Sequence, residues 1–295
     1  MRTSNTGDTI TPPARAASTF ARLRSALLLV ALGAVAACGG GDGAPTMPDP
    51  GETPAPSVLL KDVVIDRLPP PFYHFEYDAA GTVTRVSYAS GLTLYDVIHE
   101  GGRIRELRNV AGTNRDRIVY AYGATGRADR VEYVDADGVT FTRLHFTYDG
   151  PKLVAFERER RVAAGFVVDK TVTLSYHADG NLRELTQRRP RIDGFQDEAT
   201  RTDRFEQYDD GINVDGFALI HDDFFDHLVL LPGVQLQKNN PLRETRSGDG
   251  LNYTIDYALT YDDRKRPLTK RGDVTITNGT QPGTRVQTNT EFSYY

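Results

Sequence analysis

Apolar and polar side chains alternate with a period of two along several stretches of this chain. In residues 142–148 the even positions hold Thr, Leu, Phe and Tyr, whereas the odd positions hold Arg, His and Thr. Residues 171–176 repeat this alternation, and residues 252–261 show it most clearly, with Tyr, Ile, Tyr, Leu and Tyr at the odd positions. A period of two places one face of a strand in a core and the other in water. These stretches therefore predict half-buried strands of an antiparallel sheet.

The strands belong to a unit that recurs along the chain. Each copy has alternating aromatic residues, then Tyr-Asp or a close variant, then a turn that contains Gly, then a short apolar strand. Self-similarity of this kind is the signature of a repetitive fold. The copies are Phe75–Val83, Tyr120–Arg127, Phe146–Leu153 and Leu174–Leu182, with degenerate copies at Tyr208–Gly211 and Tyr261–Leu268 and a weak one at Glu100–Ile104.

Each copy predicts a β-hairpin. The Tyr supplies a large ring for the buried face, and the Asp and Gly satisfy the turn backbone and permit positive φ. Successive copies start near residues 77, 98, 122, 148, 176 and 208, and a longer interval before residue 261 leaves room for an insertion. We therefore expect one all-β domain over residues 57–295, an antiparallel up-and-down meander of repeated hairpins that forms a curved or barrel-like sheet.

The insertion is expected to contain a helix near residues 215–231. Its apolar residues follow one another at spacings of three and four, as on one face of an amphipathic helix. Asp215 is a suitable N-cap, and Pro232 with Gly233 would end the helix. We expect it to cover an open end of the sheet. The apolar stripe consists of Phe217, Ile220, Phe224, Leu228 and Leu231.

The first 37 residues have the pattern of a signal peptide. Arginines precede an uninterrupted small and apolar run over residues 26–37, which is too short to span a bilayer as a permanent helix. The run ends in residues that resemble the lipobox of bacterial lipoproteins. The resemblance implies cleavage after residue 37 and lipidation of the only cysteine; the alternatives are an ordinary secretory signal and a misjudged start codon. The matching residues are Val35, Ala36, Ala37 and Cys38.

Residues 38–56 are expected to be the lipidated Cys followed by a tether. Five Gly and five Pro among residues 39–56 make this segment flexible and extended rather than folded. Gly39, in place of Asp, resembles lipoproteins that are sorted to the outer membrane. That resemblance implies an outer-membrane lipoprotein and leaves open which face of the membrane it occupies.

The repeated hairpin resembles two known groups of proteins. Its Tyr-Asp…Gly pattern is similar to the YD repeat of Rhs-type secreted proteins. A group of bacterial envelope lipoproteins of unknown function resembles the chain more closely over roughly residues 72–270. Asn239-Asn240-Pro241 matches the group's Asn-Asn-Pro motif, whereas Asn213-Val214 lacks its Pro. The resemblance implies an up-and-down sheet curved into a porin-like barrel, and it implies no activity.

Composition and charge exclude several classes of site and partner. A single Cys excludes an intramolecular disulfide and a zinc site with several thiolates. The net charge of −5 becomes −8 when the leader, which has four Arg and one Asp, is removed. An acidic protein is a poor partner for nucleic acid. We expect it to associate with the membrane through its lipid, and with an envelope protein or polysaccharide. The closing residues 292–295 resemble the aromatic end of outer-membrane barrels, but charged stretches such as 157–161 argue against lipid contact.

Candidate metal sites are weak. An Asp and a His four residues apart share one face of a helix, and both are ligand types for zinc. Turns rich in Asp and Asn offer oxygen ligands for calcium. A solvated acidic face and ordinary turns, such as 135–138, explain the same residues, so we expect no metal and no cofactor. The candidates are His221, Asp223 and His227 for the first kind of site, and Asp209, Asn213 and Asp215 for the second.

The chain contains no motif of an enzyme class. Gly-x-Ser-x-Gly, the Walker loop and the dinucleotide fingerprint do not occur. Paired carboxylates on separate strands leave no local signature, so glycoside hydrolysis stays open. The Tyr residues are expected in the core rather than stacked on sugars. We expect a non-enzymatic binding or scaffolding module; the alternatives are an envelope hydrolase acting on glycan or peptide, and an accessory subunit of an outer-membrane complex.

Overall fold

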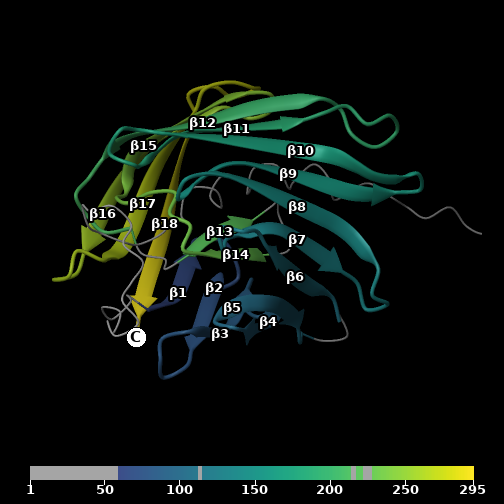
Figure 1. The fold of residues 1–295 in the computed structure, drawn as a ribbon. Helices are drawn as coiled ribbons and strands as arrows, with labels where there is room; N and C mark the ends of the chain where they lie inside the picture. Colours follow the sequence, from purple (N-terminus) through teal and green to yellow (C-terminus); the bar gives the residue numbers. More distant parts are fainter. Residues whose placement is uncertain (1–58, 112–114, 214–216, 222–227) are drawn as a thin grey trace, which may run out of the picture.

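A computed structural model describes residues 59–111, 115–213, 217–221 and 228–295, in which all regular structure is β. Sixteen strands form one closed antiparallel barrel, and two more form a separate hairpin (Figure 1). The expected all-β meander is therefore confirmed, and the sheet closes on itself.

The strands follow one another around the barrel wall, with the extra hairpin inserted between β12 and β15. Their bounds are β1 (Leu60–Ile65), β2 (Tyr73–Tyr77), β3 (Val83–Tyr88), β4 (Thr93–Glu100), β5 (Arg103–Asn109), β6 (Arg117–Tyr122), β7 (Ala128–Val134), β8 (Thr140–Asp149), β9 (Lys152–Val162), β10 (Gly165–Tyr176), β11 (Leu182–Arg189), β12 (Ala199–Tyr208), β13 (Phe217–His221), β14 (Leu228–Pro232), β15 (Pro241–Gly248), β16 (Tyr253–Tyr261), β17 (Pro267–Ile276) and β18 (Arg285–Tyr294).

The first and last strands pair and close the barrel. Val63 lies opposite Phe292 and Ile65 lies opposite Thr290 in the β1–β18 ladder. The amide of Tyr295 then donates to the carbonyl of Leu59, 3.1 Å away. Closure removes the two free edges that an open sheet of this size would expose.

The turns show why the Tyr-Asp motif makes hairpins. In the β2–β3 turn, Oδ1 of Asp78 accepts hydrogen bonds from the amides of Ala80 and Thr82, each 2.9 Å long. Gly81 has a φ of 80°, which a residue without Cβ adopts at little cost. The β16–β17 turn repeats the bonding around Asp262, with Lys265 in the positive-φ position. The motif therefore encodes its own turn.

A second recurring bond links each hairpin to the one before it. The hydroxyl of Tyr122, at the end of β6, donates to the carbonyl of Ile104 at 2.6 Å. Tyr148 and Tyr176 make the same bond to Ala128 and to Leu153. We call this bond the tyrosine clasp, and the barrel end where it occurs the repeat rim. The further clasps are Tyr77 to Leu60, Tyr208 to Leu182 and Tyr294 to Pro267.

The expected alternation is observed, and the core lies inside the barrel. On β8, Leu144 and Phe146 are buried, whereas Arg143 and His145 between them are only partly buried. Some of the Tyr residues belong to the core as expected: Tyr73 and Tyr95 are among the most enclosed side chains. Tyr122 and Tyr148 of the repeated motif are only partly buried and pack against that core.

The insertion differs from the expected helix near 215–231. Phe217–His221 and Leu228–Pro232 pair as antiparallel strands, and Figure 1 shows β13 and β14 in the middle of the barrel. Val229, Leu230 and Leu231 are all buried, so both faces of β14 lie in the core. Within β14, residues 228–231 are all apolar, so they fit the three- and four-residue spacings of a helix as well as they fit a buried strand. Asp215, the expected cap, lies outside the described residues.

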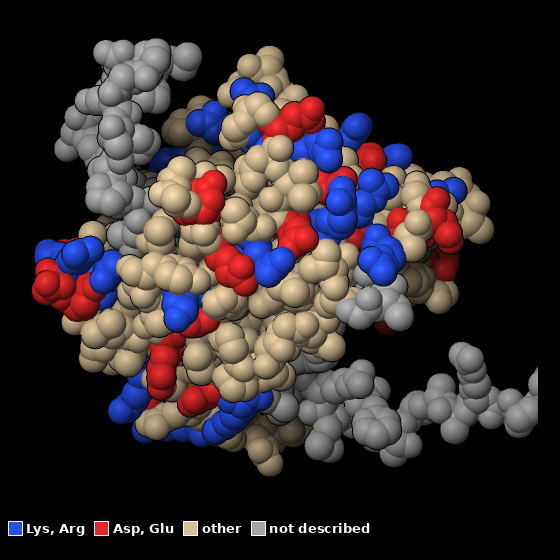
Figure 2. Space-filling view, turned by 90° about the horizontal axis from the view of Figure 1, so that it is seen from below, with Lys and Arg blue, Asp and Glu red and all other residues tan. Residues whose placement is uncertain are grey.

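The outer face of the barrel carries ion pairs between neighbouring strands. Arg85 Nε lies 2.9 Å from Asp96, and Arg204 Nε lies 2.8 Å from Glu184. Figure 2 shows acidic and basic side chains interspersed over one face of the molecule. Within the described part of the chain, no helix has the length and apolar character needed to cross a membrane.

Candidate functional site

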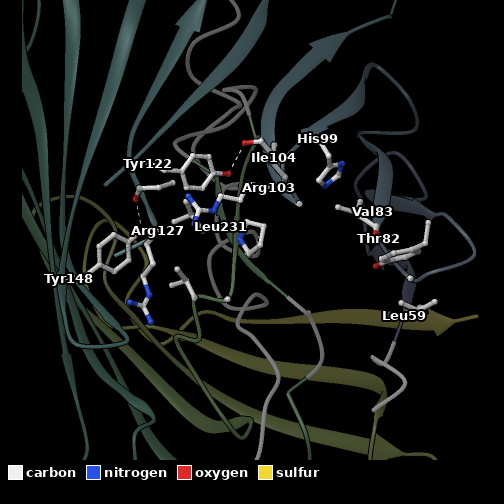
Figure 3. A pocket seen from close by; sticks show the side chains of 18 residues that line it. Leu59, Thr82, Val83, His99, Arg103, Ile104, Tyr122, Arg127, Tyr148 and Leu231 are labelled. Carbon is white, nitrogen blue, oxygen red and sulfur yellow. Dashed lines mark hydrogen bonds between the residues drawn. The ribbon is translucent and has the colours of Figure 1, made fainter. Parts of the chain in front are cut away.

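A cavity of about 430 Å³ lies at the repeat rim, between the barrel wall and the end of the inner hairpin. The first three hairpins of the wall contribute their turns to it, and the segment after β14 forms the opposite side (Figure 3). Its size is within the range of small-molecule sites. The lining residues are Leu59, Tyr77, Gly81, Thr82, Val83, His99, Gly102, Arg103, Ile104, Tyr122, Gly126, Arg127, Ala128, Tyr148, Leu231, Pro232, Gly233 and Val234.

One side of the cavity is cationic and aromatic. The guanidinium of Arg103 lies 5.4 Å from the ring centre of Tyr122, and that of Arg127 lies 5.9 Å from the ring centre of Tyr148. A Cβ on Gly126 would lie 3.0 Å from Nη2 of Arg103, so this arginine passes directly over the β6–β7 turn. The rings hold both guanidinium groups at the cavity wall through cation–π contacts.

The tyrosine hydroxyls at this side are neutral hydrogen-bond donors. Burial raises the pKa of Tyr122, and the positive charge of Arg103 opposes that shift only in part. Burial likewise raises the pKa of Tyr148 well above its usual value, against the opposing charge of Arg127. Both phenols therefore keep their protons at neutral pH and remain committed to the clasps with Ile104 and Ala128.

The other side of the cavity is mainly apolar. Figure 3 shows Leu59, Thr82 and Val83 across the cavity from the two arginines. Leu231 and Val234 form the inner wall, and both are nearly fully buried. The amide of Leu230 donates to the hydroxyl of Tyr120 on β6 at 3.0 Å, which fixes the inner hairpin to the barrel wall beside the cavity.

The residues considered for calcium hold turns together. Asp209 Oδ1 accepts from the amides of Gly211 and Asn240 at 3.0 and 3.1 Å, and its second oxygen accepts from the Tyr261 hydroxyl. Asn213 donates to the carbonyl of Asn239 at 3.3 Å. In the turn at 135–138, Oδ1 of Asp135 accepts hydrogen bonds from two backbone amides in the same way.

The remaining predicted site residues are not brought together by the described structure. His221 is the last residue of β13, paired through its backbone with Leu228. Over the described ranges, no group of three or more His, Cys, Asp or Glu is arranged to hold a metal ion. Asp223, His227, Asp215, and the lipobox Val35, Ala36, Ala37 and Cys38 lie outside the described residues.

Buried ion pairs inside the barrel were missed by the sequence reasoning. Arg158, in the charged stretch expected to face water, is buried and makes two hydrogen bonds of 2.7 and 2.9 Å to Asp169. Arg246 pairs with Asp203 in the same forked geometry at 2.5 and 2.8 Å. Charges on neighbouring strands leave no local signature, because their pairing depends on the register of the sheet.

The cavity residues were also missed, although the chain contains a signal for them. The hairpin of β6 and β7 has Tyr122-Gly123 where the motif has Tyr-Asp. In the β16–β17 hairpin, the motif's Asp262 binds Arg266 at 2.6 Å, and Arg266 occupies the position that corresponds to Arg127. The β6–β7 hairpin has Gly123 in place of that Asp, and its arginine, Arg127, lines the cavity. The absent carboxylate is therefore the sequence signal for this site.

The fold is similar to that of solved porin-like structures, and comparison by sequence finds nothing. A porin-like protein from Bacteroides uniformis superposes with a TM-score of 0.53 at 14% identity, over 76% of this chain and 89% of the other. One from Bacteroides vulgatus gives a TM-score of 0.49 at 14% identity, over 81% of this chain and 99% of the other. No protein-family model and no curated protein matches the chain.

Proposed function

We propose that this protein is a lipid-anchored envelope barrel that binds a small molecule at its repeat rim and has no catalytic role. The observation that carries the proposal is the 430 Å³ cavity, which combines apolar walls with a few oriented polar groups. Concave, mainly apolar pockets with few polar groups are the usual form of ligand sites.

The filled interior favours binding over conduction. The core joins the inner hairpin to the barrel wall, since Val229, Leu230 and Leu231 belong to the same buried cluster as Tyr120 and Val131 of the wall. A channel of the porin kind needs a polar, water-filled lumen. An interior packed with side chains, apart from a cavity at one end, suits a carrier or receptor instead.

The outer surface and the leader support attachment by a lipid. The ion pairs Arg85–Asp96 and Arg204–Glu184 lie on strands where a membrane-spanning barrel would carry an apolar band. Cys38 and the lipobox before it supply the anchor, and Gly39 favours the outer membrane. Leu59 lines the cavity and directly precedes β1, so the first strand of the barrel starts at the rim that holds the proposed site.

The test of binding is the identification of a small molecule that copurifies with the protein. We expect mass spectrometry of organic extracts to find one compound in near-stoichiometric amount. Thr82 is exposed and lines the cavity, so Thr82→Trp should narrow the cavity and remove the compound. Thr84→Trp, at an exposed residue of β3 outside the lining, is the matched control. The same amount of the compound in extracts of the wild type, Thr82→Trp and Thr84→Trp would contradict the proposal.

The test of attachment is separate. Cys38→Ser should move the protein from the membrane fraction to the soluble fraction, because the lipid is the proposed anchor. Retention of the variant in washed membranes would contradict lipid anchoring and leave the binding proposal untouched.

A further inference from the structure

We infer that the cavity at the repeat rim takes an amphipathic anion, whose carboxylate or phosphate-monoester head is bound by Arg103 and Arg127 and whose apolar body lies along Leu59, Val83 and Leu231. This inference rests on the proposed binding function and specifies the chemical class of its ligand.

The first support is the charge of the lining. None of the 18 residues that line the cavity is acidic, whereas two are arginines. Among the described residues, no carboxylate lies within ion-pair distance of Arg103 or Arg127. Asp129, on the strand after Arg127, is exposed and does not line the cavity. Asp129 is nevertheless close enough to Tyr148 to raise the pKa of that phenol, so its carboxylate offsets part of the positive charge at the wall. The lining itself carries two positive charges and no negative charge, which favours an anion.

The second support is that both guanidinium groups are positioned in advance. Arg103 and Arg127 lie over tyrosine rings that are themselves fixed by their clasps to the barrel backbone. Arginine binds an oxyanion with two parallel hydrogen bonds, and the two ring contacts place both guanidinium groups on the same side of the cavity. Fixed donors lower the entropic cost of binding.

The third support is the contrast with the last complete hairpin. Arg266 lies 4.4 Å from the ring centre of Tyr294, and Arg127 lies 5.9 Å from that of Tyr148. Tyr294 makes the same clasp as Tyr148. Arg266, however, is neutralised by Asp262 of its own turn. Position 123 holds Gly instead, so the repeat omits the carboxylate at the cavity. The carboxylate nearest to that position belongs to Asp129, which is exposed and lies outside the lining.

The apolar side of the cavity explains why the ligand has a body as well as a head. Figure 3 separates the arginines from Leu59 and Val83, so a ligand that spans the cavity meets charge at one end and hydrocarbon at the other. Transfer of an acyl or aromatic body to these walls is favourable at about 25 cal/mol per Å² of apolar surface buried.

The binding experiment compares an acid with its neutral ester on the full chain. We expect cis-parinaric acid to bind at least tenfold more tightly than its methyl ester, by fluorescence titration. The Arg103→Gln/Arg127→Gln double variant should lose that preference and still bind the ester. Arg266→Gln, which removes the same ring contact away from the cavity, is the matched control and should bind as the wild type does.

A second pair of variants restores the missing carboxylate. Gly123 does not have a positive φ, and the atom closest to a Cβ there would be the flexible Asp129 carboxylate at 3.2 Å, so a side chain can be accommodated. Gly123→Asp should pair with Arg127 as Asp262 pairs with Arg266, and weaken binding of the acid at least fivefold. Gly123→Asn has the same shape without the charge, and it should leave the affinity for the acid unchanged.

The outcomes separate the two proposals and the two head groups. Equal binding of acid and ester, with no effect of the arginine variants, would overturn the anion inference and leave a binding function. Binding of neither probe by a folded protein would also overturn the anion inference, and the copurification experiment would then decide the binding function. Displacement of the bound acid by decanoate but not by decyl phosphate supports a carboxylate head, and the reverse supports a phosphate head. Displacement by neither overturns the inference.

Discussion

Two ionisable side chains, Glu244 and Lys270, are buried in the barrel wall, and burial shifts the pKa of each. Glu244 accepts hydrogen bonds from the hydroxyls of Tyr253 and Tyr257, at 3.0 and 2.7 Å, and burial raises the pKa of its carboxyl group. Lys270, on β17, lies 4.0 Å from the ring centre of Tyr257. Burial lowers the pKa of Lys270 to about 8, because the charged form is poorly solvated there, although the charge of Glu244 opposes the shift.

The lowered pKa of Lys270 makes stability depend on pH. Between pH 8 and 10 the unfolded chain holds the lysine proton more tightly than the folded chain, so this group makes the folded state more stable as the pH rises. We expect the free energy of unfolding of the wild type, relative to Lys270→Met, to increase by about 2 kcal/mol between pH 7.5 and 9.5. Urea unfolding at each pH measures it. The free energy of unfolding of Lys265→Met, at an exposed lysine, should change with pH as that of the wild type does. The same pH dependence in Lys270→Met would refute the expectation.

Gly272 is required by close packing rather than by backbone conformation. A Cβ at this position would lie 2.7 Å from Oγ1 of Thr288 and 2.9 Å from a methyl group of Ile255. Gly272→Ala should therefore destabilise the protein by about 1–3 kcal/mol, the usual cost of overpacking. Thermal unfolding measures the loss. Addition of Thr288→Ala should recover part of the lost stability. A Gly272→Ala variant as stable as the wild type would show that the neighbouring side chains move to make room for the methyl group.

At the scale of elements, the hairpin with its clasp is the unit of construction. The same features recur around the barrel: a turn capped by a carboxylate, a bulge next to the Tyr, and a hydroxyl bonded to the preceding hairpin. The Tyr176 clasp to Leu153 is 2.6 Å long, and Lys152 lies 4.6 Å from the same ring. The clasp satisfies a backbone carbonyl at the rim and ties β10 to β9, so it acts between hairpins rather than within one.

Removal of one clasp hydroxyl should weaken the barrel without unfolding it. Tyr176→Phe keeps the ring and its contact with Lys152, and loses only the bond to Leu153. We expect a loss of about 0.5–1.5 kcal/mol in the free energy of unfolding. Tyr176→Leu should cost more, since it removes the ring as well. Equal stabilities of the wild type and Tyr176→Phe would argue against an energetic role for the clasp.

At the scale of the molecule, the inner hairpin completes the core. Sixteen strands enclose more space than their own inward side chains fill, and β14 supplies apolar residues from inside. The hairpin also forms one wall of the cavity, so the residues that stabilise the barrel are the same residues that shape its proposed site.

Truncation of the inner hairpin should therefore destabilise the whole barrel. Leu230 is fully buried, and Leu230→Ala should cost about 2–5 kcal/mol through the lost burial and the cavity that it leaves. Leu92→Ala, at a leucine that is 63% exposed, should change stability by less than about 0.5 kcal/mol. Chemical unfolding compares the two, and similar small effects would mean that β14 is not part of the cooperative core.

The local pattern of the chain determined the hairpins and little beyond them. Alternation with a period of two places Leu144 and Phe146 inside and Arg143 outside, and Tyr-Asp with a later Gly makes its own turn; both depend on residues close in sequence. Closure through β1 and β18 and the paired strands in place of the helix depended on contacts between distant segments. So did the burial of Arg158 against Asp169 and the arginines at the cavity. Sheet register and the filling of the interior decided these features, because a short sequence window contains no information about what packs against it.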